Sequence, residues 1–223
     1  MMAKCFAGST QVPGESMLSW CFDPEGNVDG DPCNPLKEEP SAERLNVMRF
    51  IIKFLWYQHL RHGCCFALMK NDKPVAAAFL VPPNNKEAYK ETACFQMWAI
   101  SKLGLPKEMS SGDSMVRFDA MAKAMGVSHR KLFGKEDLHW YIPIVAVGSE
   151  YQGKGYGREL FSFIGSLGDH TKNPMYLETF GPRNQRFYER NGFEVMDKQQ
   201  VVTKKETLKL HDGSLGMVRP ASN

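Results

Sequence analysis

A glycine-rich segment between an apolar strand pattern and a helical pattern is the part of the chain best suited to bind phosphate. This segment, GSEYQGKGYG, lies between WYIPIVAV and RELFSFIGSL. Backbone N–H groups at the start of a helix point outward, and the helix dipole favours negative charge there. Glycines let a phosphate approach that backbone closely. The pattern therefore predicts a site for a phosphate-bearing ligand at residues 148–158.

Two nucleotide motifs compete for the same segment. Gly148, Gly153 and Lys154 fit a P-loop, but residue 155 is a glycine where a P-loop carries the Ser or Thr that holds magnesium. Gly153 and Gly155 begin a dinucleotide fingerprint, but Arg158 stands where the third glycine belongs. Magnesium-dependent nucleotide hydrolysis and dinucleotide binding are both disfavoured.

A second pair of chemically useful residues lies further along the chain, in the segment YLETFGPRNQRFYERNGF, which starts at Tyr176. Pro182 suits the first turn of a helix, and Gly192 is typical of the end of one. Asn184 and Tyr188 are four residues apart, so they share one face of that helix. A linear ligand running along this face would meet an amide and a phenol.

Together these motifs resemble the GNAT superfamily of N-acyltransferases. Gln152, Gly155 and Gly157 after an apolar strand are similar to its acetyl-CoA pyrophosphate loop, and residues 176–193 resemble the second half of its domain. The segments HWYIPIVAV, YQGKGYG, LETFGPRNQRFYERNGF and LGMVRP resemble the puromycin N-acetyltransferase-like branch. The branch does not imply that antibiotic as the substrate, because fold and cofactor site outlast changes of acceptor.

The resemblance implies an α/β (α+β) chain with the GNAT fold, in which a single mixed central sheet is splayed between two strands and flanked by helices. In that family the pantetheine arm of acetyl-CoA lies in the gap between the splayed strands. No metal is expected. The implied cofactor-binding residues are Ile144, Val145, Ala146, Val147, Gln152, Gly153, Lys154, Gly155, Tyr156, Gly157, Arg158, Asn184 and Tyr188.

The resemblance also implies direct transfer of an acetyl group from acetyl-CoA to a primary amine, with proximity as the main contribution. A backbone N–H of residues 144–147 would stabilise the oxyanion, near Pro143, whose missing donor is tolerable where strands separate. Tyr188 would protonate the departing thiolate. The general base stays open between Glu178, His139 and a water relay, because a one-residue register decides which way Glu178 faces.

The acceptor pocket is expected from residues 84–141 and from the helix before them. A closed pocket for a small amine is favoured over the open, acid-lined groove that a protein lysine would need, because of four aromatic residues: Trp56, Tyr57, Trp98 and Trp140. A protein-lysine acetyltransferase and a non-catalytic sensor that binds CoA or acyl-CoA stay as alternatives.

The elements that must position these residues follow from periodicity. Apolar side chains at 3.6-residue spacing predict a helix over residues 41–63, with Ser41 as its N-cap. Residues 65–83 predict a β-hairpin that turns at 71–74. Further patterns predict helices over 87–103 and 114–125 and strands over 140–147, 175–180 and 193–196. The tail, through residues 215–219, predicts one last strand pair.

Residues 1–40 differ from the rest of the chain, since they hold five prolines and two basic against seven acidic side chains. We expect an irregular or loosely helical acidic segment over 1–40 and the GNAT domain over 41–220. The usual first strand of the family is missing before this domain, so either the chain is truncated or the sheet starts differently.

Charge and hydropathy bear on partners and compartment. The net charge is +3, with no Lys/Arg run, which favours a small anionic ligand over nucleic acid. The helix residues Arg183, Arg186 and Arg190 are expected on a solvated basic surface. The most apolar long stretch, residues 48–60, is too short and too charged to span a bilayer, so we expect no membrane association and a cytoplasmic monomer or homodimer. Six cysteines without a CxxC pair are expected as reduced thiols.

Overall fold

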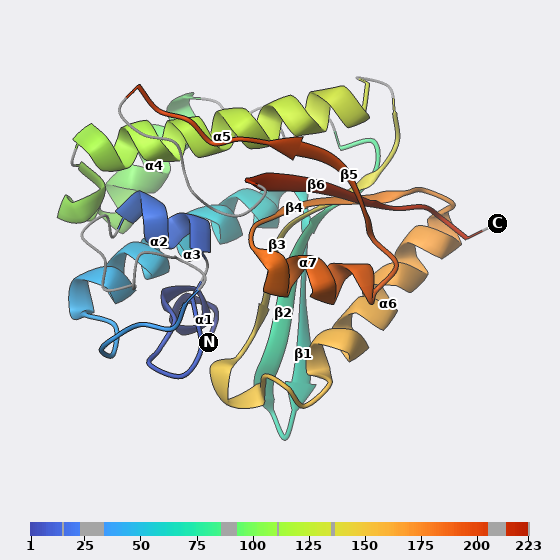
Figure 1. The fold of residues 1–223 in the computed structure, drawn as a ribbon, viewed down its shortest axis with the longest axis horizontal. Helices are drawn as coiled ribbons and strands as arrows, with labels where there is room; N and C mark the ends of the chain where they lie inside the picture. The colour runs from blue at the N-terminus through green and yellow to red at the C-terminus, as the bar shows by residue number, and fades with distance from the viewer. Residues whose placement is uncertain are drawn as a thin grey trace.

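The computed structural model describes residues 1–14, 16–22, 34–85, 93–110, 112–134, 137–204 and 213–222. At its centre is one six-stranded sheet in the order β1-β2-β3-β4-β6-β5 (Figure 1). Strands β3 and β4 are parallel, and the other neighbours are antiparallel. The strands are β1 (Cys64–Lys70), β2 (Lys73–Val81), β3 (Trp140–Val147), β4 (Met175–Thr179), β5 (Glu194–Gln199) and β6 (Ser214–Arg219). The predicted single mixed sheet is confirmed.

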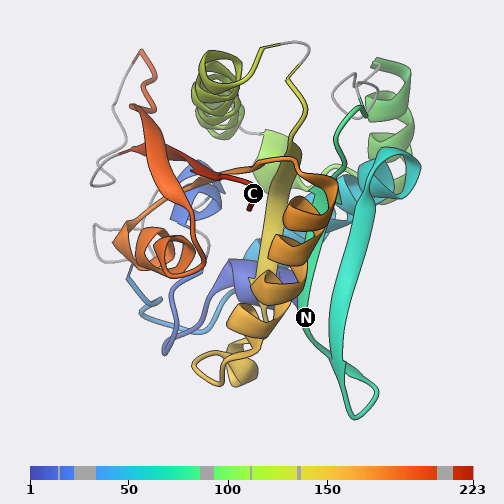
Figure 2. The ribbon, with the colours of Figure 1, turned by 90° about the vertical axis from the view of Figure 1, so that its right-hand side faces the viewer.

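Helices cover both faces of the sheet. Helices α6 (Tyr156–Thr171) and α7 (Pro182–Glu189) pack on one face, and Figure 2, which faces α6, shows the β1–β2 hairpin on one side of it and β5 and β6 on the other. The remaining helices lie toward the other face or the edge of the sheet: α1 (Met2–Ala7), α2 (Ser16–Phe22), α3 (Ala42–His62), α4 (Ala93–Leu103) and α5 (Gly112–Leu132). Of two 3₁₀ turns, η2 (Lys107–Ser110) lies between α4 and α5, and η3 (Ser149–Tyr151) lies between β3 and α6.

The helix and hairpin that precede the site form where the sequence predicts them. Ser41 caps α3, since its Oγ accepts a hydrogen bond from the Arg44 N–H at 3.1 Å, and α3 ends before Gly63. Asn71 and Asp72 turn the hairpin with φ angles of 49° and 58°. Two consecutive positive φ angles match the twist of the flanking strands, which is why Asn and Asp suit this turn.

Other elements extend or shift the predicted ones. Helix α4 begins at Ala93, and the first part of the helix predicted over 87–103 lies outside the described residues. Helix α5 is longer than the predicted 114–125. Within residues 1–22 the chain forms α1 and α2, and no strand precedes Cys64 in the part of the chain that the structure describes. The sheet therefore starts with β1 at its edge.

Two layers of apolar side chains sandwich the sheet, as alternation along β2 shows. Ala78 and Leu80 pack toward α6, whereas Phe79 packs toward α3 and α1. Full burial of such a Leu or Phe side chain contributes about 1.5–3 kcal/mol. A third cluster, under α2 and α5, includes Phe180 just after β4. These layers hold β3, β4 and the helices around them in fixed positions.

Strand β3 changes face at a bulge beside Pro143. Its pairing with β2 passes from Phe79↔Ile144 to Val81↔Tyr141, so β3 has one residue more than β2 between these pairs. Ile142 packs in the α6 layer, whereas Ile144 packs in the α3 layer. A bulge tolerates proline, which lacks a backbone N–H, and it redirects the residues that follow.

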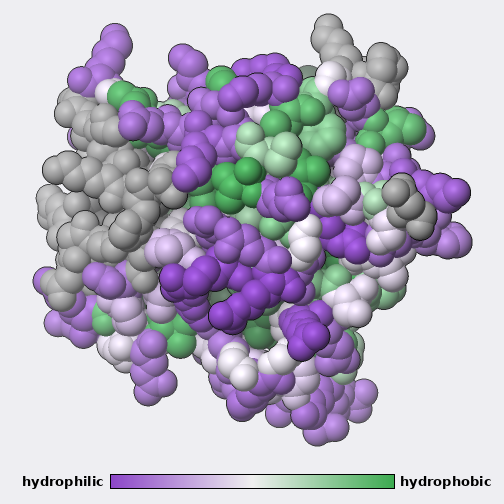
Figure 3. Space-filling view, turned by 45° about the vertical axis from the view of Figure 1, so that its right-hand side comes forward, coloured by the Kyte–Doolittle hydropathy of each residue, from purple (hydrophilic) through white to green (hydrophobic). Residues whose placement is uncertain are grey.

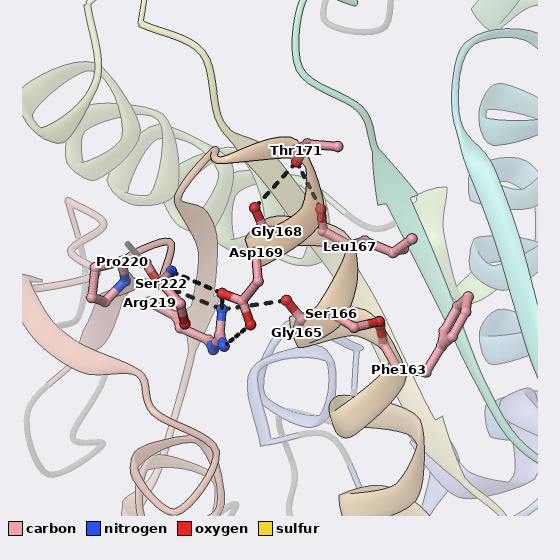
Figure 4. Close-up of polar contacts among 10 residues, drawn as sticks. All are labelled: Phe163, Gly165, Ser166, Leu167, Gly168, Asp169, Thr171, Arg219, Pro220 and Ser222. Atoms are coloured by element: carbon pink, nitrogen blue, oxygen red, sulfur yellow. Dashed lines mark hydrogen bonds and ion pairs between the residues drawn. The ribbon is translucent and has the colours of Figure 1, made fainter.

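The last strand is fastened to α6 by a two-pronged ion pair (Figure 4). Arg219 Nη1 and Nη2 donate to Asp169 Oδ1 and Oδ2 at 2.9 and 2.8 Å, and the Ser222 N–H also donates to Oδ1. This arrangement holds the pKa of Asp169 well below its usual range, first through the Arg219 hydrogen bonds. No helix in the described parts of the chain is long and apolar enough to cross a membrane.

Candidate active site

Strands β3 and β4 separate after a short stretch of pairing. They pair at Trp140↔Met175 and at Tyr141↔Tyr176, which we call the fork, and no later pair joins them. Strand β4 continues along β6 as far as Thr179. A gap therefore opens between residues 142–147 of β3 and 177–179 of β4. The splay that the sequence predicts is confirmed.

One edge of β3 presents its backbone polar groups to this gap. The Gly148 N–H donates to Val75 O of β2 at 2.9 Å. Because successive residues of a strand point their polar groups to opposite edges, those of Val147 and Val145 face the gap. The Val147 carbonyl accepts hydrogen bonds from Cys5 Sγ at 3.0 Å and Gln152 Nε2 at 3.2 Å. The end of the gap is thus bordered by α1 and by the glycine loop.

The glycine loop (Gly148–Gly155) delivers the N-terminus of α6 to this end of the gap. Gly153 and Gly155 have φ angles of 74° and 88°, and a Cβ at either position would meet no atom within 4 Å. Gly155 is the N-cap of α6, and no side chain caps the first turn. The N–H groups of that turn therefore stay available to an anion.

Basic side chains surround the loop. Lys70, at the tip of the β1–β2 hairpin, donates to the Tyr156 hydroxyl, and Lys154 Nζ lies 5.8 Å from the Tyr151 ring centroid. Arg183 Nη2 donates to Gln152 Oε1 at 2.6 Å. Cations from three elements thus face the start of α6, and such a cluster attracts phosphate.

Glu178 lies two residues beyond the fork, on the face of β4 that carries Tyr176. Its Oε2 atom is enclosed and has no hydrogen-bond partner. Burial raises the pKa of Glu178. The Tyr176 and Tyr141 hydroxyls act to lower this pKa, but burial has the larger effect, and the resulting pKa is about 7. A carboxyl group with a pKa near neutral can accept a proton at physiological pH. The sequence did not determine the strand register at Glu178, and in the structure the Glu178 side chain lies on the face of β4 that packs against α5.

The other predicted base, His139, is paired with a second histidine. Its Nε2 lies 2.7 Å from His129 Nε2, and its Nδ1 lies 3.1 Å from Asp137 O. Burial lowers the pKa of His139, and burial with the neighbouring His139 and Arg130 lowers the pKa of His129 to about 4. Both rings are neutral at pH 7, and His139 stands on the paired side of the fork. Glu178 suits the role of base better.

Comparisons with known proteins show a similarity to acetyltransferases. Residues 121–195, from the second half of α5 into β5, match the model of the acetyltransferase (GNAT) domain. Over these residues the chain is similar to a GNAT acetyltransferase domain. It is also 26% identical over 149 residues to an uncharacterized N-acetyltransferase of Schizosaccharomyces pombe, an alignment that covers 66% of this chain and 57% of that protein. The chain thus spans a little over half the length of this relative.

Solved structures of acetyltransferases align with most of the chain. Arylalkylamine N-acetyltransferase 2 from Aedes aegypti aligns with a TM-score of 0.56 at 12% identity, over 96% of this chain and 90% of that chain. A histone acetyltransferase HPA2 and related acetyltransferase from Corynebacterium glutamicum aligns with a TM-score of 0.48 at 17% identity, over 82% and 76%. At these identities the likeness concerns the fold alone.

The fold brings the predicted cofactor residues of β3, the loop and α6 to one end of the gap. Tyr188 lies on α7 beside this region, with its ring centroid 5.4 Å from that of Phe161 and 5.3 Å from that of Phe187. Asn184 is half-buried on α7. The cofactor roles of both residues stay predictions. Figure 3 shows hydrophilic residues across the middle of one face, where the exposed charged side chains of α7 lie.

Three outcomes differ from sequence expectation. Arg183 is exposed, but it reaches Gln152 of the loop instead of standing apart on a solvated surface. Cys5 lies at the gap, which no local pattern could show because it is 142 residues from its partner Val147. Trp140 is buried in the α6 layer and donates to Thr171 Oγ1 at 2.9 Å, so it does not belong to the acceptor pocket.

The other three aromatic residues of the expected pocket do lie together. The Tyr57 ring is 5.5 Å from Trp56 and 5.4 Å from Trp98, between α3 and α4. Trp56 and Trp98 are 42% and 44% exposed, which weakens the argument for a closed pocket. The five described cysteines are free thiols, as predicted, and no cluster of three metal-ligating side chains occurs in the described ranges.

Proposed function

We propose that this chain transfers an acetyl group from acetyl-CoA directly to the primary amine of a small molecule. The observation that carries the proposal is the gap beyond the fork, which runs from the enclosed carboxyl of Glu178 to the uncapped first turn of α6. A long thioester with a pyrophosphate near one end fits such an arrangement. Acetyl-CoA supplies the activated acyl group.

Residues of the chain would bind the cofactor, transfer the protons and hold the two substrates together. The first turn of α6, Lys154 and Arg158 would hold the phosphates, and the gap-facing backbone of Val145 and Val147 would hold the pantetheine arm and polarise the thioester carbonyl. Glu178 would take the proton from the amine, which then attacks as a neutral nucleophile. Tyr188 would return a proton to the thiolate. Side-by-side binding of both substrates supplies most of the acceleration.

The likeness to the puromycin N-acetyltransferase-like branch rests on the sequence motifs and is part of this proposal. So is the small-molecule acceptor, which Trp56, Tyr57 and Trp98 favour because aromatic faces bind organic ammonium groups. Residence in the cytoplasm and a monomeric or homodimeric state also belong to the proposal.

Thiol release from acetyl-CoA tests the proposal with a panel of primary amines and, in parallel, lysine-containing peptides. Release that depends on a small amine, with the matching N-acetyl product identified by mass, supports it. Release with the peptides alone would indicate a protein-lysine acetyltransferase. Acetyl-CoA binding without release from any acceptor would indicate the sensor.

A further inference from the structure

Buried polar atoms without hydrogen-bond partners collect on the sheet face beneath α5. Of five such side-chain atoms among the described residues, four lie here: Glu178 Oε2 and the hydroxyls of Tyr176, Ser128 and Ser214. They come from β4, from the facing part of α5 and from β6. An enclosed hydroxyl that forms no bond costs about 1–3 kcal/mol. Four such atoms in one place are costly for the stability of the fold, so we expect a functional reason for them.

Two of these hydroxyls flank a single glycine. A Cβ at Gly216 would collide with Ser128 Oγ and lie 3.4 Å from the Tyr176 hydroxyl. Gly216 is also the β6 partner of both Glu178 and Asp197. The absence of a side chain at residue 216 therefore leaves the hydroxyls of α5 and β4 space between the two carboxyl groups.

The two carboxyl groups differ in their surroundings. Glu178 lies beside the gap, and its Oε2 atom has no exposed surface through which to exchange protons with solvent. Asp197 is 5% exposed, but it accepts hydrogen bonds from Lys131 and, at 2.7 Å, from Gln199. The Lys131 side chain is 62% exposed. Asp197 is thus connected to the protein surface.

The pKa shifts of Tyr176 and Asp197 show that neighbouring groups of this cluster act on one another. Burial raises the pKa of Tyr176 far above its usual value, reinforced by the charge of Glu178, so its hydroxyl stays protonated. Burial also acts to raise the pKa of Asp197, but the hydrogen bonds from Lys131 and Gln199 outweigh it and keep the carboxyl ionised, and the nearby Ser128 hydroxyl acts in the same direction. The Ser128 hydroxyl acts to lower the pKa of both Tyr176 and Asp197.

We propose that Tyr176, Ser128 and Asp197 form the path by which a proton leaves Glu178 for the surface at Lys131. The path rests on the proposed function, since it starts with the proton that Glu178 takes from the amine. Tyr176 and Ser128 are positioning residues in this scheme, and neither touches the substrates.

Each step of the path conserves protons. The N–H bond of the amine breaks, and its proton joins Glu178. Each hydroxyl then accepts a proton on its oxygen and releases its own to the next group, and Asp197 passes the last one to solvent. Glu178 returns to its ionised form for the next turnover.

Removal of single hydroxyls tests the path. Tyr176→Phe and Ser128→Ala should each lower kcat about tenfold and raise the solvent deuterium isotope effect on kcat, with the acetyl-CoA Kd unchanged. Their thermal midpoints should equal or exceed that of the wild type, because each variant loses a buried, unpartnered hydroxyl. Ser214→Ala is the matched control, since it deletes the same kind of hydroxyl on β6 and should leave kcat unchanged.

If the wild type shows amine-dependent turnover, the proposed function is supported, and two results would still overturn the proton path. One is wild-type kcat and isotope effect in both Tyr176→Phe and Ser128→Ala. The other is an equal loss of kcat in Ser214→Ala, which would mean that the hydroxyls act through structure. A wild-type chain with no amine-dependent thiol release would instead overturn the proposed function, and the path with it.

Discussion

Glu178 has the properties of a base because of its position at the fork. Burial raises the pKa of its carboxyl to about 7, so the ionised form that accepts a proton gains population as the pH rises through neutrality. The sequence placed Glu178 on a strand but left its facing undecided, since a shift of one residue reverses it. Only the pairing of β4 with β3 and β6 settles that question.

The substitution Glu178→Gln should lower kcat about a hundredfold at pH 7.5, because the amide cannot accept the proton. In the wild type, kcat should rise with pH through about 7 as the carboxyl ionises, and this rise should be absent from the variant. Initial rates of thiol release between pH 5.5 and 9 measure both. A wild-type rise that persists in Glu178→Gln would assign the titration to another group.

Tyr188→Phe should lower kcat about tenfold or more and leave the acetyl-CoA Kd nearly unchanged, because the proposed role of the phenol is to protonate the departing thiolate. The ring contacts with Phe161, Phe187 and Phe193 do not need the hydroxyl, so the thermal midpoint should stay close to that of the wild type. Kinetics, calorimetry and thermal unfolding of the same samples provide these values. Unaltered kcat would show that Tyr188 is only a packing residue.

At the scale of elements, the sequence predicts those features whose structure depends on a few neighbouring residues. The cap at Ser41, the turn at Asn71 and the glycine loop were legible because each depends on a few neighbouring residues. The contacts of Cys5 and Arg183 with the loop were not, because they join segments far apart in the chain. His129 on α5 and His139 just before β3 are only 10 residues apart, but their contact depends on how α5 packs against the sheet, which local patterns do not show.

Helix α6 depends on a glycine where it meets α7. A Cβ at Gly157 would lie 3.1 Å from Phe187 and 3.4 Å from Val147 Cγ2, so Gly157→Ala should push α7 outward and weaken acetyl-CoA binding. Gly126→Ala in α5 is the matched control, because its Cβ would meet only the flexible end of Arg130. That control should stabilise the fold by about 0.5–1 kcal/mol through helix propensity. Equal behaviour of both variants in binding and thermal unfolding would contradict this packing argument.

At the scale of the whole molecule, the Arg219–Asp169 pair fastens the last strand of the sheet to α6 (Figure 4). The pKa of Asp169 is depressed in the fold, so the pair stabilises the protein above the unfolded pKa of an aspartate and loses this effect as the pH falls. Arg219→Ala should lower the thermal midpoint by about 2–4 °C at pH 7, and by less at pH 3. A deficit that is the same at both pH values would rule out the ion pair as its cause.

The global arrangement followed from the family resemblance more than from composition. Periodicity supplied strands and helices, and the separation of β3 from β4 was implied by the resemblance that the motifs at residues 139–193 carry. The order of the strands in the sheet was not predicted. Charge did not reveal that Lys70, Lys154 and Arg183 meet at one loop, because they belong to different elements. The bulge beside Pro143 shows how a single residue, noted in the sequence as a missing donor, marks the position where the strands part.

The most direct test of the central claim is the binding of acetyl-CoA, measured by calorimetry on the wild type, Gly155→Glu and Gly104→Glu. Both glycines have positive φ angles, 88° and 71°, and a Cβ at either meets nothing within 4 Å, so the two variants carry the same strain and charge. Gly104 follows α4, across the molecule from the loop (Figure 1). We predict that the wild type and Gly104→Glu bind alike and that Gly155→Glu does not bind. Absence of binding to the wild type, or equal binding by all three proteins, would contradict the assignment of the loop as the acetyl-CoA site.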